Sequence, residues 1–439
     1  MLKTPTKKTL LALVIIVSNN VLAEDFLDGG GFDFDSSEIE THEPHWTDGF
    51  KTTLAHNHTQ IPGAINREQS SLRIEFEHNL AEGWYLQLDS RYRYFWGEDD
   101  FAKARRNGEA YDEVKWQRAS IQYSQSACTA TLGRQSLIWG SVEGTFVTDI
   151  VTPFDYTEQL LTDYGTVRLA QDMLVSECFA GRGQLQVFYT PEAETDLYQH
   201  HPLQVTLAPG LPPVLLEADA DEEWGMRFQW QGSGYDLSLM AARLYDNTPS
   251  FVIRTEEGQA SNNLPGGIGN ILFPPEFSAE AQLAQFNLIG VASSVAIGRL
   301  LIKSEFAYRN RQITSSTGEF GARYDAAVGL EFTTYNNHML NAGVWLARFE
   351  DENAKAQEFE IVTVGWRKTY LNDNLAMSLL GNHSSEPEFS MLTILAEYQW
   401  NDYLSTDLAF TLADLNKLDT PVPIAPAEES VTVGIKYEF

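Results

Sequence analysis

The chain is dominated by runs in which apolar and polar residues alternate. Residues 72–77 place Leu, Ile and Phe between charged side chains, and the same period of two recurs at 84–96, 226–230, 302–309 and 404–412. Because successive side chains of a strand point to opposite faces, each run predicts a strand with one apolar and one polar face. The length of each run is close to the about 9–11 residues that a tilted membrane-crossing strand needs.

Short turns and longer connections alternate between these runs. We expect short turns at 79–83, 124–127, 180–183, 231–234, 293–298, 335–338, 370–373 and 401–402, and longer connections at 57–68, 97–112, 138–166, 191–223, 247–281, 312–320, 351–357, 384–388 and 414–428. This layout is typical of membrane barrels with tight periplasmic turns and longer extracellular loops. The sequence therefore predicts an all-β fold: a transmembrane antiparallel outer-membrane β-barrel of about 18 strands over residues 47–439, with both ends periplasmic. A soluble β-sandwich would share the period, but its strands would usually be shorter and would lack systematic aromatic ends.

The N-terminus has the three-part layout of a secretory signal peptide. Lysines precede the apolar run 9–17, and Ala23 ends a short cleavage motif, so residues 1–23 are expected to be the signal. The run is shorter than the about 20 apolar residues that a spanning helix needs. Residues 24–46 are rich in acids and contain no Lys or Arg, which predicts a flexible acidic periplasmic segment.

Charge and hydropathy narrow the function classes. The formal net charge of −31 argues against nucleic acid as a partner, because such binding depends on neutralising phosphates. A mean hydropathy of −0.27 is polar for a membrane protein. A barrel accounts for it, since only every second residue of each strand faces lipid.

The last nine residues, 431–439, carry an apolar or aromatic residue at every second position and end on Phe439, with Tyr437 two places before. This stretch resembles the terminal strand of bacterial outer-membrane β-barrels. The resemblance implies that Tyr437 and Phe439 form the signal read by the barrel-assembly machinery. It also implies outer-membrane lipid and lipopolysaccharide as surroundings. The alternative is an ordinary amphipathic edge strand at the end of the chain.

The polar face of the strands carries both signs of charge, so it commits to neither anion nor cation selectivity. Pairing across strands, which would stabilise the wall, is the simplest role for most of these charges. The predicted inner-face charges are Arg73, Glu75, Asp89, Arg91, Arg93, Lys303 and Glu305.

The third long connection is the most unusual stretch. Trp139 and Gly140 are expected to end a strand, and Val147, Val151 and Phe154 follow in a loop that is too apolar for water. We expect this loop to fold into the barrel interior, because loops at membrane depth are tolerated where they line a cavity.

The same stretch carries a family resemblance. Gly-Arg-Gln at 133–135, Trp-Gly at 139–140 and the Asp-Ile-Val-Thr-Pro-Phe-Asp run at 149–155 resemble the signature of an uncharacterised group of proteobacterial outer-membrane porin-like proteins, and 168–191 is similar to that group too. The similarity covers 133–191. Gly-Arg-Gln also occurs in alginate-export-type porins, which the chain resembles in outline. Because members are often encoded beside exporters of the resistance–nodulation–division type, the resemblance implies an exporter as a partner.

General porins fold their third loop inward, and by analogy we place residues 140–165 in the lumen as a constriction. Arg134, Trp139, Asp149 and Asp155 are the expected constriction residues. In the alternative, the loop only buttresses the wall, and the two aspartates cap turns.

The cysteines are expected to pair. Cys128 begins the strand before this loop and Cys178 ends the strand after it. Opposed residues of neighbouring antiparallel strands have Cα atoms about 4.5–5.5 Å apart, which is within disulfide range. We therefore predict a disulfide that closes the hairpin carrying the loop.

No catalytic or cofactor site is expected. Neither Gly-x-Ser-x-Gly nor His-Glu-x-x-His occurs. His383 and the pair 200–201 lack a partnered acid at an informative spacing, so surface histidines are the simpler interpretation. The acids at 217–223 lack the spacing of an EF-hand, which favours a solvated loop over a metal site.

Together these features predict a porin-like outer-membrane channel for small solutes, and not an enzyme. One alternative is an outer-membrane accessory of an exporter that handles lipid or hydrophobic cargo. A remote alternative is an outer-membrane hydrolase. The sequence leaves the solute, the direction of transport, the gating and the oligomeric state open.

Overall fold

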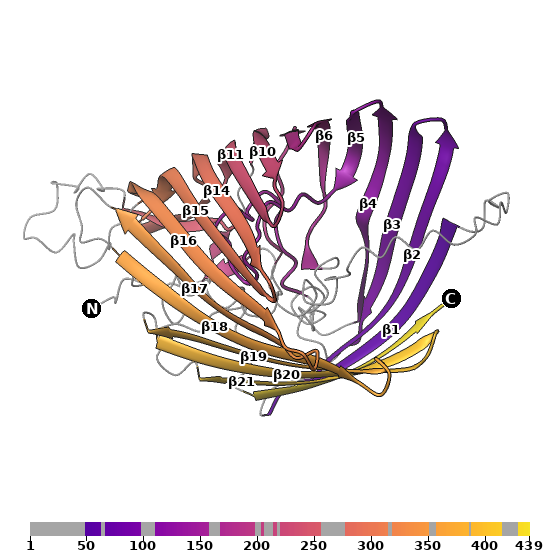
Figure 1. Cartoon of the computed structure of the whole chain (residues 1–439). Coiled ribbons are helices and arrows are strands. Elements are labelled where there is room, and N and C mark those ends of the chain that lie inside the picture. The colour runs from indigo at the N-terminus through magenta and orange to yellow at the C-terminus, as the bar shows by residue number, and fades with distance from the viewer. Residues whose placement is uncertain are drawn as a thin grey trace, which may run out of the picture.

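The computed structural model describes residues 49–62, 66–97, 110–157, 167–197, 203–205, 214–216, 220–255, 277–314, 318–350, 357–385, 388–414 and 429–439. Within these ranges, 18 strands form one antiparallel sheet that curls into a barrel (Figure 1). β1 (Phe50–Gln60) pairs with β2 (Arg67–Ala81) on one side and with β22 (Glu429–Glu438) on the other. The sheet therefore closes on itself, and the predicted 18-stranded β-barrel is confirmed.

Each barrel strand pairs with the next barrel strand along the chain. The strands between β2 and β22 in the barrel are β3 (Trp84–Phe95), β4 (Tyr111–Gln125), β5 (Cys128–Gln135), β6 (Gln171–Ala180), β7 (Gly183–Thr190), β10 (Glu223–Gln231), β11 (Tyr235–Tyr245), β14 (Gln285–Ile297), β15 (Leu300–Ile313), β16 (Phe320–Thr333), β17 (Met339–Glu350), β18 (Gln357–Tyr370), β19 (Leu375–Ser385), β20 (Glu388–Asn401) and β21 (Leu404–Asp414).

The short turns lie where the alternation placed them. All eight of the expected positions connect consecutive paired strands, from β2–β3 to β20–β21. Two of the longer connections carry short hairpins of their own: β8 (Leu203–Val205) with β9 (Val214–Leu216), and β12 (Ser250–Thr255) with β13 (Phe277–Gln282). No helix in the described part of the chain is long and apolar enough to cross a membrane.

The two faces of the wall follow the alternation of the sequence. On β22, Val433, Ile435 and Tyr437 are exposed on the outer face. Thr432, which alternates with them, is buried inside and hydrogen-bonds Thr59 of β1. An apolar outer row and a polar inner row are the arrangement expected of a barrel wall in lipid.

One expected strand end differs. β5 ends at Gln135, so Trp139 and Gly140 do not end a strand. After Gln135 the chain turns into the barrel, and Trp139 is only 1% exposed, packed edge-on against Phe188 of β7. From this point the chain no longer pairs as part of β5, and the Trp139 indole is buried inside the wall instead. The expected signal peptide and acidic segment, 1–46, lie outside the described residues.

Candidate functional site

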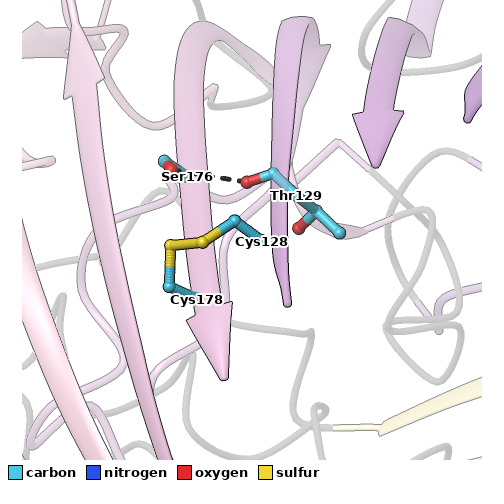
Figure 2. Close-up of a disulfide and its surroundings, with 4 residues drawn as sticks. All are labelled: Cys128, Thr129, Ser176 and Cys178. Atoms are coloured by element: carbon cyan, nitrogen blue, oxygen red, sulfur yellow. Dashed lines mark hydrogen bonds between the residues drawn. A yellow bond between two sulfur atoms is a disulfide. The ribbon is translucent and has the colours of Figure 1, made fainter. Parts of the chain in front are cut away.

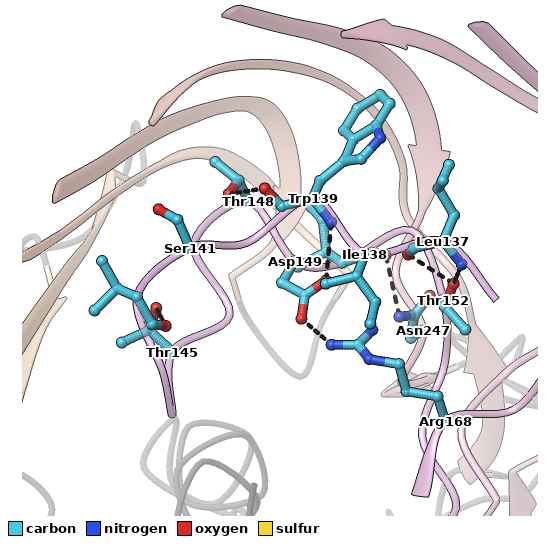
Figure 3. A network of polar contacts seen from close by, with 12 residues as sticks. Leu137, Ile138, Trp139, Ser141, Thr145, Thr148, Asp149, Thr152, Arg168 and Asn247 are labelled. Atoms are coloured by element: carbon cyan, nitrogen blue, oxygen red, sulfur yellow. Dashed lines mark hydrogen bonds and ion pairs between the residues drawn. The ribbon is translucent and has the colours of Figure 1, made fainter. Parts of the chain in front are cut away.

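The connection between β5 and β6, here called the lumen loop, lies inside the barrel over its described residues, 136–157 and 167–170. Its side chains and backbone contact inward-facing residues from β2 on one side of the lumen to β17 on the other. Figure 3 shows the polar contacts that hold its central part. Residues 158–165 of the expected constriction lie outside the described residues.

The far end of the lumen loop, residues 141–148, is held by a carboxylate of the wall. Glu305 of β15 accepts hydrogen bonds from the backbone N–H groups of Ser141, Val142 (2.6 Å) and Thr148 (3.1 Å). The hydroxyls of Ser141 (3.1 Å) and Thr148 (2.7 Å) donate to it as well. Glu305 is buried, and hydrogen bonds to a charged acceptor are the stronger kind. One side chain thus satisfies several buried polar groups of the loop.

Other wall groups around Glu305 bind the same part of the loop. Arg309, also on β15, donates to the carbonyls of Phe146 (2.7 Å) and Val147 (3.3 Å). Lys303 pairs with Glu143 of the loop and lies 2.5 Å from Glu331 of β16. One lysine therefore serves two carboxylates.

Burial raises the pKa of Glu143, Lys303 opposes this and the nearby Glu331 carboxylate adds to it, so that the pKa is about 7. Glu143 therefore changes charge near neutral pH. This carboxyl belongs to the loop and not to the wall, so its ionisation acts on the contact between them.

The near end of the loop, residues 155–157, is held by cations of the wall. Asp155, which is fully buried, pairs with Arg93 of β3 at 3.1 Å and with Lys115 of β4. Thr157 donates to it through both its backbone N–H (2.9 Å) and its hydroxyl (2.5 Å). Burial alone would raise the pKa of Asp155, but Arg93 and Lys115 outweigh it and hold the pKa well below its usual range. Glu113 provides a second carboxylate for Arg93.

A third ion pair lies within the connection itself. Asp149 pairs with Arg168, and both are buried. Asp149 also accepts the backbone N–H of Trp139 at 3.3 Å, as Figure 3 shows. The Arg168 guanidinium lies 4.5 Å from the centre of the Phe154 ring. Asp149 therefore ties the outgoing part of the loop to the part that returns to β6.

Glycines of the inner wall leave room for loop side chains. A Cβ atom on Gly329 of β16 would lie 3.1 Å from Val142, and one on Gly290 of β14 would lie 3.1 Å from Thr148. A Cβ on Gly225 of β10 would lie 2.9 Å from the Trp139 indole. These distances are tighter than ordinary van der Waals contact, so wall and loop are shaped to each other.

Apolar packing completes the docking. Val147 and Val151 are fully buried. Phe146 packs edge-on against Phe154 within the loop (ring centres 4.9 Å apart) and against Trp345 of β17 (6.0 Å). A buried apolar side chain contributes about 1.5–3 kcal/mol, so this cluster provides much of the free energy that keeps the loop in the lumen.

The four residues expected at the constriction separate into two groups. Trp139, Asp149 and Asp155 belong to the docked loop, where the Trp139 indole N–H donates to Gln186 of β7 at 2.7 Å. Arg134 alternates in step with Leu132, which is 59% exposed on the outer face, and it pairs with Glu194 at 2.7 Å. Arg134 therefore lies on the outer face of β5.

The inner-face charges have two kinds of partner. Arg73 pairs with Asp89 of the neighbouring strand at 2.7 Å, as cross-strand pairing predicts. Arg93, Lys303 and Glu305 instead bind the loop. The sequence marked these three as inward, but it held no signal for which of them meet the loop, because their partners are far away along the chain.

Cys128 and Cys178 face each other directly in the β5–β6 register and form a disulfide, with Cα atoms 4.1 Å apart (Figure 2). The bridge lies beside the short turns, at the end of the hairpin opposite to the lumen loop. Cys128 and Cys178 alternate in step with Leu132 and Leu174, which are exposed outside. The disulfide is therefore on the outer face.

The terminal residues close the barrel. Phe439 exchanges two backbone hydrogen bonds with Thr52 of β1, each of 2.9 Å. Tyr437 and Phe439 have ring centres 5.7 Å apart and are both exposed. The expected assembly signal is thus accessible on the outer surface at the seam between the first and last strands.

The remaining candidates are placed as follows. His383 lies on β19 and contacts the Ser390 hydroxyl at 3.0 Å, whereas 200–201 and 217–219 lie outside the described residues. Glu223 begins β10 and accepts the backbone N–H of Tyr245 at 2.6 Å. In the described ranges, no group of three or more His, Cys, Asp or Glu is placed to hold a metal ion.

No protein-family model matches this sequence, and no curated protein sequence matches it. Solved structures with a similar fold are outer-membrane porins. OccAB2 of Acinetobacter baumannii has a TM-score of 0.53 at 10% identity, over 90% of this chain and 99% of that chain. OccAB3 of the same organism gives 0.52 at 9%, over 89% and 98%. OpdK of Pseudomonas aeruginosa, solved with vanillate, gives 0.52 at 8%, over 89% and 98%. The chain therefore has the fold of an outer-membrane porin-like β-barrel.

Proposed function

We propose that this protein is an outer-membrane channel through which small solutes diffuse, and that the lumen loop is a fixed constriction. The observation that carries the proposal is the docking of the loop across the lumen, from Arg93 and Lys115 on one side to Glu305 on the other. A barrel of this strand number is wide enough to hold an aqueous channel. A loop that is held at both ends narrows this channel as a fixed constriction and does not act as a freely moving gate.

Within this proposal the charged groups have distinct roles. Asp149 and Asp155 hold the loop in place and do not face the solute, because their carboxylates are consumed by buried ion pairs. Trp139 anchors the outgoing chain to the wall. We further propose a Gram-negative outer-membrane location, periplasmic chain ends, lipid and lipopolysaccharide as surroundings, and assembly through Tyr437 and Phe439.

The proposal is tested by planar-bilayer recording of the refolded chain, with and without residues 141–163. Steady single-channel conductance that rises on deletion is expected. The OpdK ligand, vanillate, is a useful test solute beside an uncharged sugar. A point variant, Glu305→Ala, should raise conductance in the same direction, whereas Glu397→Gln, on the inner face of β20, should leave the constriction intact.

A folded, heat-modifiable barrel that conducts in neither form would contradict the channel. That result would favour the exporter accessory that the sequence resemblance implies, and a lipid-transfer assay would then be the next measurement. Hydrolysis of lipid by the same preparation would favour the outer-membrane hydrolase. Both alternatives stay secondary, because the docking of the loop provides a direct reason for a channel.

A further inference from the structure

A cluster of hydrogen-bond donors lies on the outer face of the barrel, beside the turn between β16 and β17. His338, the last residue of that turn, receives the indole N–H of Trp366 on its Nδ1 at 2.9 Å. The ammonium of Lys368 lies 3.0 Å from its Nε2. Trp366 and Lys368 alternate along β18 with inward residues and share the outer face with Val362 and Val364, which are 42% and 50% exposed.

This cluster has one donor too many. Indole and ammonium groups only donate hydrogen bonds, and a neutral imidazole offers one acceptor and one N–H. If Nδ1 accepts from Trp366, then Nε2 carries its proton and faces the Lys368 ammonium, which is donor against donor. If Nε2 accepts from Lys368 instead, then Nδ1 carries the proton and faces the indole N–H of Trp366, which is also a donor. In either tautomer, one N–H is left for an acceptor from outside the chain. The Lys368 ammonium also lies 5.1 Å from the centre of the Tyr370 ring, a contact that leaves its N–H groups able to donate to such an acceptor.

The position of the cluster selects that acceptor. The turn is held by a hydrogen bond from the His338 backbone N–H to the Thr334 hydroxyl (3.0 Å), which fixes the backbone of His338 at this position. Exposed apolar and aromatic groups occur in the same turn and in the turn between β18 and β19: Tyr335 is 85% exposed and Leu371 63%. Aromatic residues with a snorkelling lysine mark the level of lipid headgroups. The groups at this level that accept hydrogen bonds and carry negative charge are lipid phosphates.

We propose that His338 and Lys368, with Trp366 orienting the imidazole, bind the phosphate of a phospholipid on the outer face of the barrel, at the end that carries the short turns. The phosphate oxygens accept from His338 Nε2–H and from Lys368, which resolves the excess of donors. This inference rests on the proposed membrane location, which puts the short turns at the periplasmic leaflet. It does not depend on whether the lumen conducts.

Native mass spectrometry of the full chain with phosphatidylglycerol tests the site. Lys368→Met should lower retained lipid about tenfold, because it removes a charge-assisted hydrogen bond to the phosphate, and Lys368→Arg should restore most of it. Trp366→Phe should weaken binding less, because it removes only the group that orients His338. The matched control is Arg348→Met, which removes a cation from the outer face near the opposite end of β17, where Arg348 pairs with Glu350 and Glu358.

Equal lipid retention by Lys368→Met and wild type overturns the proposal and assigns the spare donors to water. Competition by inorganic phosphate at the same concentration as the lipid would also overturn it, because the site would then take a free anion and not a headgroup. Bilayer conductance is recorded in parallel and should be unchanged in Lys368→Met. Loss of lipid with normal conductance, or the reverse, separates this site from the channel.

Discussion

The lumen loop is held at its two ends by opposite chemistry. At the far end the wall supplies the carboxylate, Glu305, and the loop supplies backbone N–H groups. At the near end the loop supplies the carboxylate, Asp155, and the wall supplies Arg93 and Lys115. Glu305 binds mainly backbone N–H groups, which exist in any sequence, beside two hydroxyls. The near anchor is an ion-pair network that depends on three particular side chains. The first fixes the backbone path of the loop, and the second fixes the charge balance of the lumen.

The largest effect is expected from Glu305→Ala. It leaves the backbone N–H groups of the buried Val142 and Thr148 and of the half-buried Ser141 without their acceptor, and each buried group of this kind costs about 1–3 kcal/mol. We expect a loss of several kcal/mol in loop docking, noisy conductance, and faster proteolysis within 141–148. Limited proteolysis of the folded barrel measures this. Glu397→Ala removes an inward carboxylate elsewhere and should leave cleavage at the wild-type rate; equal cleavage of both variants would show that Glu305 is not an anchor.

Asp155→Asn should come second. Breaking a buried ion pair costs about 3–5 kcal/mol, but Glu113 remains as a partner for Arg93 and reduces the loss. The lumen also gains one positive charge, so reversal potentials in a salt gradient should shift toward anions. Asp407→Asn, on the inner face of β21, makes the same change of charge away from the loop. Both variants should shift selectivity, and only Asp155→Asn should lower the midpoint of heat unfolding.

The wall glycines are expected to give a smaller effect that tests shape alone. Gly329→Ala places a methyl group 3.1 Å from Val142, and overpacking of this kind costs about 1–3 kcal/mol. We expect raised current noise without a change in selectivity. Gly343→Ala is the matched control, because the new Cβ would meet only the Val328 carbonyl, at 3.6 Å. If the two alanine variants behave alike, the close fit of loop and wall has no energetic role.

Glu143 should give the smallest effect, and it should depend on pH. Its folded pKa of about 7 lies above the ordinary value of 4.5, so its contribution to stability is present below pH 4.5 and is lost as pH rises through 7. Glu143→Gln keeps the side chain neutral. The variant should therefore unfold at a slightly higher temperature than wild type above pH 7 and at the same temperature below pH 4.5. A lower unfolding temperature of the variant above pH 7 would mean that the ion pair with Lys303 dominates instead.

The sequence predicted the wall far better than the loop. Strands, turns and the opposed cysteines follow from a period of two and from counting residues along a hairpin, and both are local. Glu305 and Ser141 are 164 residues apart, so no local pattern indicates that they meet. Arg134 was expected at the constriction because it lies in the Gly-Arg-Gln motif before the loop. In the structure it alternates in step with the exposed Leu132, and this puts Arg134 outside.

The sequence also could not predict which wall glycines leave room for loop side chains. Gly225, Gly290 and Gly329 read as weak points in otherwise regular strands, because glycine lacks a side chain to pack in a sheet. The reason for Gly290 and Gly329 becomes visible only when the loop lies against them, whereas a Cβ on Gly225 would also meet Ala242 and Phe188 of the wall, each at 2.7 Å. The excess of donors at His338 is a similar case, since it depends on contact between neighbouring strands and not on a motif.

The disulfide gives the chain a property that outlasts its fold. Cys128 and Cys178 are 50 residues apart and enclose the whole lumen loop, so the segment between them is a covalent ring with two linear tails. When the barrel unfolds, that ring stays closed, and the unfolded chain is more compact than a linear polymer of the same length. β5 and β6 therefore begin every refolding attempt as neighbours, and the loop always starts from the hairpin to which it must return.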